Sequence, residues 1–216
     1  MRARQLLIGL GSLATLAGCM RSDEPHGIRT DSLTYRDGSL VPTGLLSPTA
    51  RLDSFDVYWY SQQLAALQEP RMTEAAPQRS SESYRFLWLR SFHHPVAIRV
   101  YSSPDGGVVV TSEGKGAGGY APESLLRRDS AEITQQQWHA LTTAIAEEAL
   151  WTRGVIDTSR LGLDGATWTI EGRRGNRYVL VTRWAPMDTG ATAFMRRLGL
   201  AFLRIARVDV PPQDLY

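Results

Sequence analysis

Cysteine is almost absent from this chain of 216 residues, and Cys19 is its single example. One thiol excludes an internal disulfide, so burial of apolar groups must stabilise the fold. Long apolar runs are also missing, because the longest candidate, residues 6–18, is shorter than the roughly 20 residues that span a bilayer. These absences favour a water-exposed domain and leave Cys19 without a structural partner.

Net charge is small as well. The formal charge is +2, and it falls to zero without residues 1–18, because Arg2 and Arg4 are the charged residues of that segment. Binding of nucleic acid needs a concentrated positive field that neutralises phosphates. The composition therefore predicts no nucleic-acid partner. About 198 residues remain after residues 1–18, which is enough for one domain with its own core.

The N-terminal segment has the pattern of a bacterial export signal. Arg2 and Arg4 precede the apolar run 6–18, and Cys19 follows it directly. Residues 16–19, Leu-Ala-Gly-Cys, resemble the lipobox of bacterial lipoproteins, in which the cysteine receives diacylglycerol and becomes the first residue. The resemblance implies lipidation of Cys19. Met20 stands where an aspartate would retain the protein in the inner membrane, so we expect the outer membrane, facing the periplasm.

The rest of the chain divides into four parts by composition. Residues 19–50 contain several prolines and no sustained period, and we interpret them as a tether. Residues 51–83 hold a helix, with Val57, Tyr60, Leu64 and Leu67 at helical spacing, and then a linker. Residues 84–207 form the main domain, and residues 208–216 form a tail.

The main domain alternates strand and helix signals. Strands are expected at 84–91, 95–102, 108–113, 166–172 and 177–184, where aromatic and β-branched residues are frequent. A capping box from Thr134 to Gln137 begins one helix, and a second runs over about 191–207. The order β-β-β-α-β-β-α, preceded by one helix, predicts a two-layer α+β fold with helices packed on one face of an antiparallel sheet.

Two motifs suggest cofactors on paper. Gly114, Gly116 and Gly119 have G-x-G-x-x-G spacing, but the residues after them are too few for the long helix of a dinucleotide site. We expect a turning loop and no nucleotide. His93 and His94 are adjacent and extended, so they point to opposite faces and do not share a metal ion. The prediction is a protein without cofactor or metal.

Four charged residues lie within otherwise apolar strands: Arg90, Arg99, Glu171 and Arg183. If they converge on the sheet, guanidinium groups beside a carboxylate could bind an anionic or carboxylate ligand. The alternative interpretation is a solvent-exposed face of the sheet, in which arginine stems cover apolar neighbours. Asp164 and Glu171 form a candidate pair of acids for glycoside hydrolysis.

Four collinear motifs support a family resemblance. They are F-L-W-L-R-S-F-H-H-P, G-A-G-G-Y, G-L-D-G-A-T-W-T-I-E-G and R-Y-V-L-V-T-R-W-A-P, within residues 84–207. Together they resemble a group of uncharacterised bacterial proteins with the same order of motifs. The resemblance implies a shared domain and assigns no catalytic residue. Thr182 stands where many members of that group have aspartate.

These observations lead to one main functional hypothesis and two alternatives. We expect a lipid-anchored periplasmic binding or interaction domain at the outer membrane, with an envelope protein or a cell-wall ligand as its partner. One alternative is a hydrolase acting on envelope material through Asp164 and Glu171. The other is a structural subunit of an envelope assembly. The missing catalytic signatures favour the binding domain over an enzyme.

Overall fold

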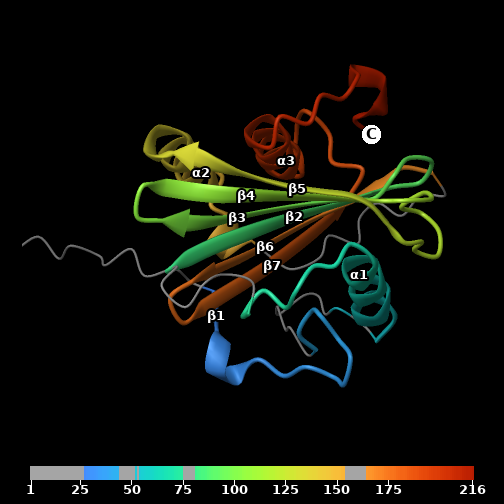
Figure 1. The fold of residues 1–216 in the computed structure, drawn as a ribbon, viewed down its shortest axis with the longest axis horizontal. Coiled ribbons are helices and arrows are strands. Elements are labelled where there is room, and N and C mark those ends of the chain that lie inside the picture. Colours follow the sequence, from blue (N-terminus) through green and yellow to red (C-terminus); the bar gives the residue numbers. More distant parts are fainter. Residues whose placement is uncertain (1–26, 44–51, 53, 75–80, 154–163) are drawn as a thin grey trace, which may run out of the picture.

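The centre of the protein is one open antiparallel sheet with the strand order β1-β7-β6-β2-β3-β4-β5 (Figure 1). The computed structural model describes residues 27–43, 52, 54–74, 81–153 and 164–216. The strands are β1 (Ile28–Arg29), β2 (Glu82–Arg90), β3 (Val96–Ser103), β4 (Gly106–Gly114), β5 (Leu125–Thr134), β6 (Ala166–Arg174) and β7 (Arg177–Trp184). The helices are α1 (Ser54–Ala66), α2 (Gln135–Glu147) and α3 (Ala193–Ile205). The predicted α+β class is confirmed.

Strand β2 lies in the middle of the sheet and is buried on both faces. Its side chains alternate, so Phe86 and Trp88 join the core beneath α2 and α3. Leu87 and Leu89 point the other way, into the core beneath α1. Burial on both faces explains why this strand has an almost unbroken apolar sequence rather than alternating polarity. Helices α2 and α3 share one face as expected, and the additional helix α1 covers the other (Figure 1).

Aromatic rings fill the core under α2 and α3. The rings of Phe86 and Trp168 lie 5.3 Å apart between centroids, and Phe202 of α3 lies 5.8 Å from Phe86. The predicted capping box begins α2, because Thr134 Oγ1 accepts from the amide of Gln137 and Gln137 Oε1 accepts from the amide of Thr134. Sequence therefore located this helix start to the residue.

The N-terminal part of the described chain belongs to the domain. Ile28 pairs with Tyr178 of β7, and Val41 is buried in the core under α1. Residues 27–43 therefore pack on the sheet, although we predicted a tether over 19–50. Their few apolar contacts have no helical or strand period, which is why the pattern did not show them. No helix in the described ranges combines the length and apolar character needed to cross a bilayer.

Strand β5 and the C-terminal segment also differ from the expectation. β5 was not predicted, because its run of charged and polar residues, Arg127–Glu132, lacks apolar alternation. It lies at the edge of the sheet, where charged side chains remain hydrated and discourage pairing with another chain. The expected tail packs on the domain: the carbonyl oxygen of Tyr216 accepts a hydrogen bond from the Trp168 indole at 3.3 Å.

Gly199 tests the packing of α3 on the sheet. A Cβ at this position would lie 2.2 Å from Cζ3 of Trp168, closer than any real contact. We expect Gly199→Ala to lower the free energy of unfolding by about 1–3 kcal/mol, although alanine favours helix. Denaturant unfolding measures the change. Combination with Trp168→Phe, which shortens the ring system, should recover part of the loss. Equal losses in the two backgrounds would contradict this packing.

Candidate functional site

The four charged residues of the expected site do not converge. Strand register places Arg99 and Glu171 directly beside Arg85 of β2, on the face covered by α1. Arg90 lies an odd number of residues from Arg85 along β2, so it points to the face covered by α2 and α3. Arg183 also lies on that face, where its guanidinium is 5.3 Å from the ring of Phe194 in α3. The set therefore divides into two pairs on opposite sides of the sheet.

Arg99 and Glu171 belong to a buried ionic network. Arg85 Nε donates to Glu171 Oε2 at 2.7 Å, and Tyr178 donates to the other oxygen at 2.6 Å. Glu69, just after α1, accepts from Arg99 Nε at 2.9 Å and lies 3.7 Å from Arg85. The side chains of Arg85 and Glu69 are fully buried. These contacts join the segment after α1 to the centre of the sheet.

Electrostatics keep Arg85 charged and Tyr178 protonated in this network. Burial alone would lower the pKa of Arg85, but the carboxylates of Glu171 and Glu69 outweigh it and raise the pKa above its usual value. Burial, and then the neighbouring Glu171 carboxylate, raise the pKa of Tyr178, so its hydroxyl stays protonated and donates. Arg85 also donates to the carbonyl oxygen of Pro70 at 2.6 Å. The network has its partners within the protein, and its role is structural.

The fold separates Asp164 and Glu171, the two acids of the hydrolase hypothesis. Glu171 is 1% exposed and is held by Arg85 and Tyr178. Asp164 is exposed and precedes β6. The five residue steps from Ala166 to Glu171 alone extend about 17 Å along a strand, whereas glycosidase carboxyl groups lie about 5–9.5 Å apart. Asp164 and Glu171 therefore do not flank one substrate bond.

Arg90 differs from the other buried arginines. Its residue is 7% exposed, and its guanidinium lies 3.9 Å from the centre of the Trp88 ring. Its two hydrogen bonds, to the carbonyl oxygens of His94 and Asp214, are both 3.5 Å long, which is weak geometry. Its Nε has no hydrogen-bond partner, and no carboxylate in the described part of the chain lies within ion-pair distance. Burial lowers the pKa of Arg90.

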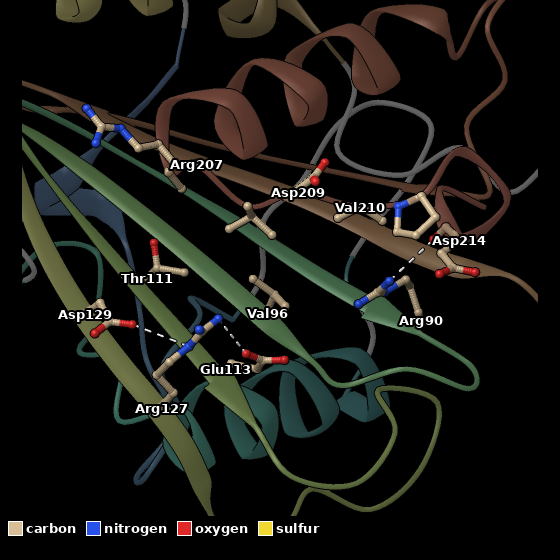
Figure 2. Close-up of a pocket in the computed structure, with 13 residues that line it drawn as sticks. Arg90, Val96, Thr111, Glu113, Arg127, Asp129, Arg207, Asp209, Val210 and Asp214 are labelled. Carbon is tan, nitrogen blue, oxygen red and sulfur yellow. Dashed lines mark hydrogen bonds and ion pairs between the residues drawn. The ribbon is translucent and has the colours of Figure 1, made fainter.

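A cavity of about 450 Å³ opens beside Arg90 (Figure 2). Its floor is the row Val96, Glu113 and Arg127, which lie next to one another across β3, β4 and β5. The segment after α3, from Ala206 to Asp214, forms the facing wall. Arg127 is bound to Glu113 at 2.9 Å and to Asp129 at 3.4 Å. Val96 thus lies between an internally paired charged side of the cavity and Arg90 at the opposite side.

The glycine-rich loop between β4 and β5 supports the end of β2 that carries Arg90. Gly118 donates to the carbonyl oxygen of His93 at 2.9 Å, and a Cβ on Gly118 would lie 2.8 Å from the Arg90 amide nitrogen. Only glycine permits this approach of two backbones. The loop leads into β5 rather than into a helix, so the context of a dinucleotide site is missing here.

The two adjacent histidines have separate partners. His93 Nδ1 lies 2.8 Å from the Tyr216 hydroxyl, and its other nitrogen lies 3.6 Å from the Asp214 carboxylate. His94 Nδ1 lies 2.7 Å from the carbonyl oxygen of Gly116. Within the described ranges, no three side chains of metal-binding type are grouped for an ion. Both histidines attach neighbouring segments to the turn after β2.

The structural role of the buried network can be tested at Glu69. Glu69→Gln removes the charge that Arg85 and Arg99 share, and we expect a loss of about 3–5 kcal/mol in the free energy of unfolding. Denaturant titration gives the value. Asp31→Asn, which disrupts the exposed pair with Arg29, should leave the unfolding midpoint unchanged and serves as control. Equal midpoints for Glu69→Gln and the wild type would contradict the assignment.

Comparison with known proteins adds nothing to these assignments, which depend on the geometry of the structure. A scan against models of protein families finds no match to the chain, and a search of curated proteins finds no significant match. The resemblance of the four motifs to a bacterial family therefore stays a prediction. Of the expected ligand-binding residues, Arg90 is the one that lines this cavity. Glu113 also lines it and Trp88 stacks against Arg90, and no signal in the sequence marked either residue.

Proposed function

We propose that this protein is a lipid-anchored periplasmic binding domain at the bacterial outer membrane, with its ligand site in the cavity beside Arg90. The N-terminal pattern, with basic residues, a short apolar run and Leu-Ala-Gly-Cys, supports the anchor. Cys19 lies outside the described residues. The described chain begins at Gly27, eight residues later, and eight residues extend at most about 28 Å. The anchor therefore holds the domain close to the membrane.

The chemistry of a lipidated cysteine makes this attachment durable. Each methylene buried in the bilayer contributes about 0.8 kcal/mol, and two or three acyl chains together give effectively permanent anchoring. A domain attached in this way needs no transmembrane helix of its own. An envelope protein or a cell-wall component is then the partner that such a domain meets.

The binding role rests on one observation, the incomplete bonding of Arg90. A buried guanidinium without a carboxylate partner is costly, because its lost hydration is not replaced. The stacked Trp88 ring compensates in part, since it fixes the plane of the guanidinium and attracts its charge. A planar anion in the adjacent cavity would complete the hydrogen bonds with bidentate geometry. Cavities of this size are usual for small ligands.

The alternative functions have less support. A hydrolase acting through Asp164 and Glu171 would need acids that the fold separates. A structural subunit would need no cavity with a poorly bonded cation. The binding domain is the function that uses both the anchor and Arg90.

The anchor is tested by replacing the thiol that carries it. The wild-type protein expressed in bacteria should incorporate labelled palmitate and sediment with outer-membrane fractions. Cys19→Ser should lose the label and accumulate with its apolar N-terminal segment uncleaved or as soluble protein. Ser22→Ala, three residues further along, is the matched control and should behave as wild type. Palmitate incorporation into Cys19→Ser would refute lipidation at this residue.

A ligand-free test separates a binding residue from a structural one. Arg90→Met keeps an unbranched chain against Trp88 and removes a buried charge without an ion-pair partner, so the thermal midpoint should stay equal or rise. Arg85→Met removes a charge that two carboxylates surround and should lower the midpoint by several degrees. Thermal unfolding followed by circular dichroism compares them. A similar fall for both variants would assign Arg90 to structure.

A further inference from the structure

The charges around the cavity restrict the ligand that Arg90 can receive. Three arginines and four acidic residues line it, which gives a formal charge of −1. Arg127 is already paired with Glu113 and Asp129. A doubly charged anion such as phosphate would meet two guanidiniums outside that pairing, those of Arg90 and the exposed Arg207, and a surplus of carboxylates. A single carboxylate on a ligand that also carries a positive group suits this lining better.

Glu113 is the acid placed to receive that positive group. Arg127 binds Glu113 through Oε2 at 2.9 Å, and no described residue bonds Oε1. Figure 2 shows Glu113 and Arg90 on opposite sides of Val96, with the cavity between them. An ammonium donates strongly to a carboxylate oxygen. Arg90 and Glu113 thus form two charged ends with Val96 between them.

The spacing of these two ends follows from the sheet. Glu113 lies beside Val96, and Val96 lies beside Trp88, on which Arg90 is stacked. Two strand spacings amount to about 10 Å. Two extended residues span about 7 Å, and with a hydrogen bond of about 2.8 Å at each end they reach about 13 Å, within about 3 Å of that spacing. Small aliphatic side chains on such a ligand would contact Val96, Val208 and Val210.

We infer that the cavity binds a short zwitterionic peptide of about two residues, with its carboxylate on Arg90 and its ammonium on Glu113. This inference rests on the proposed function and adds the class of ligand to it. Specificity comes from the two ends, because a missing charge on the ligand leaves Arg90 without a carboxylate or Oε1 of Glu113 without a donor.

The test uses the full-length lipidated protein in detergent micelles and titration calorimetry with four probes. These are the dipeptide Ala-Ala, its C-terminal amide, its N-acetyl form and inorganic phosphate. Ala-Ala should bind, and blocking either end should weaken binding about tenfold or more. Phosphate should not bind measurably.

Variants of the protein then locate each end of the dipeptide. Arg90→Gln should weaken Ala-Ala about tenfold or more. Glu113→Gln should weaken Ala-Ala to a similar degree and leave the affinity for N-acetyl-Ala-Ala unchanged, because that probe has no ammonium. Arg204→Gln and Glu132→Gln, at exposed positions outside the cavity, are the matched controls and should bind as wild type.

The outcomes distinguish this inference from the proposal beneath it. Phosphate binding that Arg90→Gln abolishes would keep the cavity as an anion site and overturn the peptide. Equal affinity for Ala-Ala and its N-acetyl form would remove the role of Glu113. Ala-Ala binding that survives Arg90→Gln, or no binding of any probe, would overturn both the peptide and the cavity as a ligand site. The blocked probes need no variant, so they decide the matter even if a substitution unfolds the protein.

Discussion

The buried contact between Glu69 and the arginines of β2 and β3 is the constraint on which the architecture depends. Glu69 follows α1, and Arg85 and Arg99 lie at the centre of the sheet, so this carboxylate determines where the α1 layer sits. Ion pairs of this kind contribute little net stability compared with apolar residues of equal volume, but one partner without the other is costly. The network therefore favours one arrangement of α1 on the sheet, because other arrangements would leave a buried charge without its partner. The central strand can then be buried on both faces.

Strand β2 contains two arginines that differ in their hydrogen bonds and ion pairs. Arg85 and Arg90 differ by an odd number of positions, so they point to opposite faces of the same strand. On the α1 face, Arg85 has two carboxylates and a carbonyl oxygen as partners. On the other face, Arg90 has an aromatic ring and two long hydrogen bonds. Arg85 thus has close hydrogen-bond partners within the protein, whereas Arg90, beside the cavity, has only weak hydrogen bonds and an Nε without a partner. Bonding, rather than burial alone, distinguishes Arg85 from Arg90, the residue for which we propose a ligand.

The sequence predicted those parts of the fold that local chemistry determines. The capping box at Thr134 and the helical spacing from Val57 to Leu67 were enough, because each signal lies within a few turns of helix. Strand β5 and the C-terminal segment were missed, because they become ordered through contacts with distant residues. For the candidate site, too, local patterns were predictable and contacts between distant residues were not. Alternation along β2 is readable in sequence, but the neighbour of Arg90 is chosen by strand register and by the chain after α3. Glu69 lies in a segment that we predicted as a linker, so the sequence did not indicate that Arg85, Arg99 and Arg128 would pair with it.

The position of the cavity suits a domain anchored at its N-terminus. The described chain begins at β1, at one edge of the sheet, and residues 27–43 pack on the α1 face. The cavity lies on the other face, over β3, β4 and β5, toward the opposite edge (Figures 1 and 2). A short connection to a lipidated Cys19 would hold the β1 edge and the α1 layer nearest the membrane. The Arg90 face would then be directed away from the lipid, where a periplasmic ligand can reach it. The same sheet that separates the two arginines would thereby separate attachment from binding.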